Sequence, residues 1–378
     1  MLSFKEFLSE GIEGKLKDGS VLSNFLHHLS SSTVYEDPKG KKESLQEARS
    51  IEDIKKDGAD NQPSGNLFHH IKTGFHAAFP EGESPEVTAQ KAKESRKHFR
   101  SWMAERGGHS EKNTMSLTGD NGKTRLSSGV GVATIGMSLA PHSSSGLHKF
   151  DTCPKASSEC RKNCLGFTAG GNRQYPEASF RSKLLRTHYI AEHPEHAARL
   201  MSHELGEHEK WSEKNGYKSG FRGNVTSDLP LEHLMPKKFF KKHKNTQFYD
   251  YTKVAGRLKN KDMPNNYSLA LSHTGTGHPE SNDKEVIKHL NNGGVVAMVH
   301  QKSKITPTHV EDVQTGKRWK VTEGDSDDNV YDRHKSAGVS SSEGVVSGLK
   351  LKGVKNEAAG HFANKVDDDG IIRINHPK

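Results

Sequence analysis

The stretch FRGNVTSDLPLEHLMPKKFFKKHKNTQFYDYTK, residues 221–253, contains the pattern that decides the fold. It starts with a strand-length run at 221–228 and ends with another at 245–253, and the segment between them spaces Leu and Phe as a helix does. A strand, a helix and a second strand in succession are typical of parallel strands joined by a crossover. The stretch therefore predicts an α/β fold with a parallel sheet.

The same alternation continues on both sides of this stretch. Helical patterns at 176–193 and 194–216 each open with a proline, which suits the first turn of a helix. Further strand-length runs lie at 129–139, 266–275, 293–301, 318–325 and 344–354. Together these elements predict a partial or full (β/α) barrel with parallel strands over residues 129–354.

The rest of the chain has a different composition. Residues 1–29 are expected to form an amphipathic leader or helix, and residues 66–128 a helical extension. Residues 30–65 are rich in Ser, Lys, Glu, Asp and Gly, which predicts a disordered linker. Residues 355–378 are expected to be a tail without helix. The barrel is thus predicted to follow a helical, partly disordered N-terminal region.

The charge balance limits the classes of partner. The 378 residues carry a formal net charge of +9 and 24 histidines, which favours an anionic substrate or a nucleic acid as partner. The basic residues are dispersed, so general solubility is an equally good interpretation. No run approaches the roughly 18–20 apolar residues of a membrane span, and no secretory segment follows Met1. We expect a soluble, intracellular protein with no membrane partner.

All three cysteines of the chain lie within twelve positions. Cys153, Cys160 and Cys164 have the spacing C-x6-C-x3-C, and no fourth cysteine occurs anywhere. An odd number of cysteines argues against a disulfide framework. In a reducing compartment, clustered thiolates are more typical of metal binding or redox chemistry. The cluster therefore predicts a metal centre in the loop that follows the first predicted strand.

Polar side chains follow nearly every predicted strand. The carboxyl ends of parallel strands meet at one edge of a sheet or barrel, where the loops converge on the active site. We therefore expect these side chains and the cysteine loop to face one cavity. The candidate site residues are Ser227, Asp228, Lys253, Ser272, His273, His300 and Asp325.

Three thiolates leave a metal centre one protein ligand short. A 4Fe-4S cluster held by three cysteines keeps one iron open to another ligand, and this arrangement resembles that of radical S-adenosylmethionine (SAM) enzymes. Their usual motif is C-x3-C-x2-C, from which the present spacing departs. Zinc is the alternative, with His148, His188 or His273 as a fourth ligand.

Several motifs taken together resemble a bacteriophage family. FDTCPKASSECRKNCLG, RGNVTSDLP, TQFYDYTK, NYSLALS and EGDSDDNVYDR occur in this order, and over about residues 129–354 they are similar to the "gene product eighty-eight" family. The resemblance implies a phage-borne protein, located in the cytoplasm of the infected host or in the virion. Members often carry further cysteines, whereas this chain has none after Cys164.

Three functional hypotheses remain open at this point. In the first, the cysteines ligate a 4Fe-4S cluster, Ser227, Asp228, Ser272 and Asp325 bind cofactor, and Lys253, His273 and His300 are catalytic. In the second, a metal-dependent hydrolase binds a divalent ion through Asp228, His273, His300 and Asp325. In the third, the chain is a non-enzymatic virion or DNA-associated protein, because a fold does not by itself imply activity.

Overall fold

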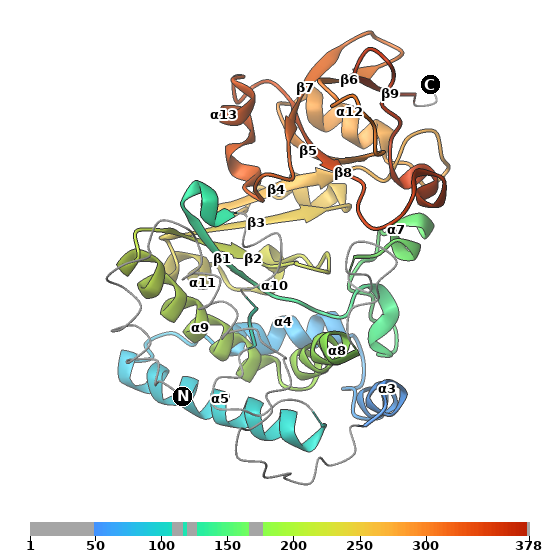
Figure 1. Cartoon of the computed structure of the whole chain (residues 1–378). Helices are drawn as coiled ribbons and strands as arrows, with labels where there is room; N and C mark the ends of the chain where they lie inside the picture. Colours follow the sequence, from blue (N-terminus) through green and yellow to red (C-terminus); the bar gives the residue numbers. More distant parts are fainter. Residues whose placement is uncertain (1–48, 108–115, 119–126, 166–176, 376–378) are drawn as a thin grey trace, which may run out of the picture.

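The computed structural model describes residues 49–107, 116–118, 127–165 and 177–375 (Figure 1). The predicted leader at 1–29 and the first part of the predicted linker lie outside this range. Nine strands within these residues form one sheet. They are β1 Val132–Gly136, β2 Lys218–Arg222, β3 Thr246–Thr252, β4 Tyr267–Ser272, β5 Val295–His300, β6 His309–Asp312, β7 Arg318–Glu323, β8 Val345–Lys350 and β9 Ile371–Ile374.

The helices of the described residues surround this sheet. The longer ones are α3 Ile51–Asp60, α4 Leu67–Ala77, α5 Pro85–Glu105, α8 Glu177–Glu192, α9 Pro194–Lys214 and α12 Asp283–Asn291. Short α-helical pieces are α7 Ser158–Lys162, α10 Leu231–Leu234, α11 Lys237–Lys242 and α13 Arg333–Ala337. Short 3-10 turns are η1 Ser127–Val130, η2 His142–Ser145, η3 Ala255–Lys259, η4 Val330–Asp332 and η5 Asn356–Phe362.

The sheet is mixed but mostly parallel. Its strand order is β1-β2-β3-β4-β5-β8-β7-β6-β9, and every neighbouring pair is parallel except β6 and β7. The first five strands therefore lie side by side in their order along the chain. The alternation of strands and helices in residues 221–253 predicts this parallel arrangement, and the structure confirms an α/β fold.

The predicted barrel is not confirmed, because the sheet stays open. β1 forms one edge and β9 the other, and the two do not pair. The physical reason lies in the last third of the chain. β6 runs antiparallel to β7, and β9 adds to β6 in parallel beyond it. These strands extend the sheet outward instead of returning to β1.

Both faces of the sheet are covered, but by different parts of the chain. On one face Phe221 of β2 and Phe248 of β3 lie in register and join the main apolar core with α8, α9 and α11. On the other face Tyr249, Ala270 and Val345 pack against Val330 of η4. The crossover helices between β1 and β5 thus pack on one face of the sheet, and the segment after β7 covers the other.

The N-terminal helices form a second layer outside α8 and α9 (Figure 1). α4 and α5 pack on α9, and α3 packs on α8. Helix α3 lies within 30–65, where the sequence predicts a disordered linker. Its Ile54 is buried, and Ser50 caps its first turn by accepting the N–H of Asp53. Burial of Ile54 and the cap at Ser50 thus stabilise a helix in a segment whose polar composition predicts a disordered linker.

Candidate functional site

The loop that carries the three cysteines runs across the carboxyl ends of the first strands. The backbone N–H of Asp228, after β2, donates to the carbonyl of Thr152 at 2.7 Å. Thr226 Oγ1 donates to the carbonyl of Leu139, after β1, at 2.6 Å. The N–H of Lys253, after β3, donates to Asp228 Oδ2 at 2.8 Å. The structure therefore holds the cysteine loop at the carboxyl edge of the sheet.

Cys153 lies among backbone groups of this edge. Its Sγ accepts the N–H of His142 at 3.4 Å and lies 3.8 Å from the carbonyl oxygen of Thr226. Burial, together with a smaller effect of negative charge at Cys164 and Asp228, raises the pKa of the Cys153 thiol to about 12. An isolated thiolate is therefore disfavoured here, so that ionisation of Cys153 requires a bound cation that compensates the charge.

Cys160 lies on α7, and this short helix is folded back onto the first cysteine. Ser157 caps α7 by accepting the N–H of Cys160 at 3.2 Å. Arg161 pairs with Asp151 Oδ2 at 2.8 Å, and Asp151 Oδ1 accepts the N–H of Cys153 at 2.7 Å. The two ends of the loop are thus joined through one carboxylate.

The three sulfur atoms do not meet at a single ion-sized point. Among the described residues, the group whose ligand atoms all lie within 4.8 Å of one another is His278, Glu280 and His361. A tetrahedral zinc ion holds its sulfur ligands about 4 Å apart, whereas an iron–sulfur cluster distributes them over separate iron atoms. The three thiols are therefore not arranged around one metal ion in this structure.

Two of the three histidines named as possible fourth zinc ligands do not complete a zinc site with the thiols. His148 is exposed, and His188 is buried with Nε2 donating to the carbonyl of Ser145 at 2.8 Å. Neither belongs to a group of three ligand atoms within 4.8 Å in the described part of the chain.

The polar atoms of Asp228 and Ser227 are engaged by other protein groups. Asp228 is 7% exposed, and its Oδ1 pairs with Arg257 Nη1 at 2.6 Å while Oδ2 accepts the N–H of Lys253. Burial raises the pKa of the Asp228 carboxyl, and Arg257 opposes this effect. Ser227 Oγ donates to Asn224 Oδ1 at 2.8 Å. Both residues therefore shape the edge of the sheet in this structure.

His273 is buried at the end of β4 with both ring nitrogens engaged. Its Nε2 lies 2.6 Å from Asp283 Oδ1, and its Nδ1 lies 3.1 Å from Asn364 Nδ2. An amide nitrogen only donates, so Nδ1 accepts and the ring proton lies on Nε2. This arrangement leaves neither nitrogen open to a substrate. The carbonyl of the preceding residue, Ser272, accepts the side-chain amide of Asn282.

The last three candidates lie at or after the ends of β3, β5 and β7. His300, at the end of β5, donates through Nδ1 to the carbonyl of Gln301 at 3.0 Å. Asp325, after β7, accepts the N–H of Lys350 and pairs with Lys352 at 2.8 Å. Lys253 Nζ lies 6.0 Å from the ring centre of Phe362 in η5. No three of the four residues in the hydrolase hypothesis form an ion-sized group in the described structure.

Several residues of this edge have no signal in the sequence. Arg257, which is 3% exposed, pairs with Asp228 and with Glu232. Asn364 comes 91 positions after its partner His273. Such long-range partners are invisible to local patterns, because neither spacing nor periodicity connects them.

Two surface cavities in the described structure lie elsewhere. One of about 470 Å³ is lined by His98, Trp102 and Glu192, among others, between α5 and α8. Another of about 310 Å³ is lined by Thr322 and Arg333, among others, near β7 and α13. Neither is lined by a residue of the cysteine loop. The carboxyl edge is therefore a candidate site because of the chemistry of its side chains, and not because a cavity lies there.

An open, mostly parallel α/β sheet with a three-cysteine loop across its carboxyl edge defines the class of this protein. No helix among the described residues is long and apolar enough to cross a membrane. The chain belongs to the Gene product 88 family of phage proteins, whose model matches residues 102–365 and confirms the resemblance found in the motifs. Searches of curated proteins and of solved structures found no match.

Proposed function

We propose that this chain is an iron–sulfur protein in which Cys153, Cys160 and Cys164 ligate a 4Fe-4S cluster at the carboxyl edge of the sheet. The observation that carries the proposal is the placement of all three thiols of the chain in one loop anchored across β1 to β3. A bound cluster would take these three thiolates as ligands on separate iron atoms.

The electrostatics of the loop fit a cluster ligand set. Burial raises the pKa of the Cys153 thiol to about 12, and a bound iron centre would stabilise its thiolate by compensating the negative charge. Burial lowers the pKa of Lys183, on α8, to about 8. A thiolate at nearby Cys164 opposes this effect and raises the pKa of Lys183. A cation beside the thiols compensates part of their negative charge.

Three cysteine ligands would leave one iron of a bound cluster open. This iron would bind a small molecule such as S-adenosylmethionine, and the cluster would pass to it one electron received from an external one-electron donor. The order of β1 to β5, with crossover helices on one face, supports a radical-SAM-like architecture by analogy with part of a barrel wall. Because Asp228 and His273 are engaged by protein partners, this proposal gives them positioning roles. Lys253 remains the cation of the edge that suits an anionic substrate.

The test is anaerobic reconstitution of the full chain with iron and sulfide. We expect about four iron and four sulfide per chain, together with the broad visible absorption of a cluster. Single Cys→Ser variants at the three positions should lose most of both. Ser342→Ala, in an exposed loop after α13, is the control and should keep the full content. A colourless protein that retains zinc and no iron, or Cys→Ser variants with unchanged iron content, would refute the proposal.

A further inference from the structure

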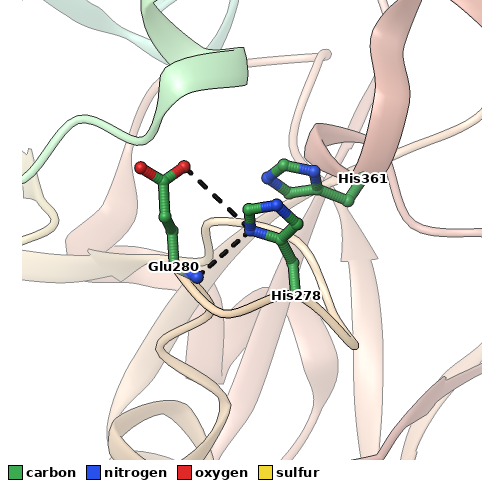
Figure 2. Close-up of side chains that lie close together, drawn as sticks. All are labelled: His278, Glu280 and His361. Carbon is green, nitrogen blue, oxygen red and sulfur yellow. Dashed lines mark hydrogen bonds and ion pairs between the residues drawn. The ribbon is translucent and has the colours of Figure 1, made fainter.

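A second group of metal-ligating side chains lies beside the cysteine loop and is separate from the thiols. His278 and Glu280 come from the loop between β4 and α12, and His361 comes from η5 after β8 (Figure 2). One ligand atom from each of the three lies within 4.8 Å of the others. The two imidazole rings stack with their centres 3.4 Å apart and their planes 9° from parallel.

The backbone and α7 hold these side chains in place. Glu280 Oε2 accepts both the N–H and the Oγ–H of Ser158, at 2.9 and 2.7 Å. The same oxygen lies 4.0 Å from His278 Nδ1. The N–H of Glu280 donates to His278 Nδ1 at 3.1 Å, so the two side chains share one tight turn. The carboxylate is therefore positioned before any ion binds.

Two buried ligand atoms at this place have no hydrogen-bond partner among the described residues. They are His361 Nε2 and Glu159 Oε2. Glu159, on α7, packs against Gly360, where an added Cβ would lie 3.0 Å from its Oε2. Burying a ring nitrogen and a carboxylate oxygen without hydrogen-bond partners lowers the stability of the fold. A cation bound to His361 would satisfy its Nε2, and the Glu159 carboxylate would add negative charge beside it.

We propose that His278, Glu280 and His361 form a site for a divalent transition-metal ion of the zinc type, with Glu159 beside it. Two imidazoles and a carboxylate are donors that suit zinc and its neighbours. Metal–ligand distances of about 2.0–2.2 Å require the donor atoms to lie roughly 3–3.5 Å apart. Donors already within 4.8 Å reach this spacing through side-chain rotations that open the ring stack.

The ion would join three segments that are far apart in the sequence. It would connect the loop after β4 with η5, and through Glu280 and Ser158 it would connect both to α7, which carries Cys160. The site would thus fix the cysteine helix on the carboxyl edge of the sheet. It does not depend on the proposed cluster, because none of its ligands is a thiol.

Titration of the metal-free full chain with Co²⁺ tests this inference. Cobalt bound by thiolates gives intense sulfur-to-metal charge-transfer absorption in the near ultraviolet, whereas cobalt bound by imidazole and carboxylate gives only weak visible bands. We expect one equivalent of Co²⁺ to bind with the weak visible bands of imidazole and carboxylate ligands. His361→Ala and Glu280→Gln should each weaken that equivalent at least about tenfold, since even an outer-shell substitution typically costs that much. His233→Ala, an exposed histidine elsewhere, should leave it unchanged.

Three outcomes separate this inference from the cluster proposal. Loss of the weak visible bands in both variants, with their circular dichroism unchanged, supports the site. Weak bands as strong in both variants as in His233→Ala would overturn it. Charge-transfer absorption without a weak-band equivalent would also overturn it, while leaving the thiol site untouched.

Discussion

Removing the Arg257 guanidinium is the most decisive test of how the carboxyl edge is held together. This side chain, on η3, is 3% exposed and contacts three buried carboxylates. It pairs with Asp228 at 2.6 Å, with both oxygens of Glu232 at 2.9 and 2.8 Å, and with Asp250 at 3.8 Å. Arg257→Met keeps most of the apolar volume and removes the cation that contacts all three carboxylates.

The expected loss follows from the charges left behind. Removing one partner of a buried ion pair costs about 3–5 kcal/mol, and Arg257 serves three carboxylates. We therefore expect the free energy of unfolding to fall by roughly 5 kcal/mol at pH 7. Burial already raises the pKa of Asp250 to about 6 with Arg257 present. Without the arginine the pKa values of Asp250 and Asp228 should rise further.

The pH dependence distinguishes an electrostatic cause from lost packing. A carboxyl group whose pKa is raised in the folded chain binds more protons there than in the unfolded chain. Its contribution is therefore present at low pH and is lost as pH rises through the folded pKa. The variant should recover stability as pH falls from 7 to 5, by about 1.4 kcal/mol per pH unit for each proton taken up.

Urea unfolding followed by circular dichroism at pH 5, 6 and 7 measures both effects. Lys237→Met is the matched control, because its ion pair with Asp262 joins side chains that are 68% and 74% exposed. Such a pair contributes about 0–1 kcal/mol. A loss in Arg257→Met no larger than in this control, or one independent of pH, would refute the electrostatic reasoning.

Two further predictions concern single positions. Burial lowers the pKa of His208 to about 4, so the free energy of unfolding should fall by about 3 kcal/mol as pH drops from 6.5 to 4. His208→Gln should remove that part of the acid sensitivity in urea titrations, and a slope equal to that of the parent chain would contradict the assignment. Gly360→Ala should cost about 1–3 kcal/mol, because Gly360 has φ +56° and a Cβ there would lie 2.9 Å from Glu159 Cδ. Gly316→Ala, at φ +68° with open space, should cost less, and equal losses would show that contact with α7 is irrelevant.

Local patterns predicted much of the sheet correctly. The runs at 245–253, 266–275 and 293–301 contain β3, β4 and β5, because buried parallel strands are apolar along most of their length. The run at 221–228 misplaced β2, which spans Lys218–Arg222 and is followed by bends at 223, 225 and 226. β6 was missed, because the four residues of His309–Asp312 alternate too briefly to be recognised.

The amino-acid sequence by itself determined the α/β class, the family and the gathering of all thiols in the loop after the first strand. These depend on composition, motif and local periodicity, which need no knowledge of distant contacts. Only the tertiary structure decided that the sheet stays open, that Asp228 and His273 are already paired, and that His278, Glu280 and His361 meet. Each of these depends on residues brought together across long stretches of chain, where packing and burial, not spacing, select the partners.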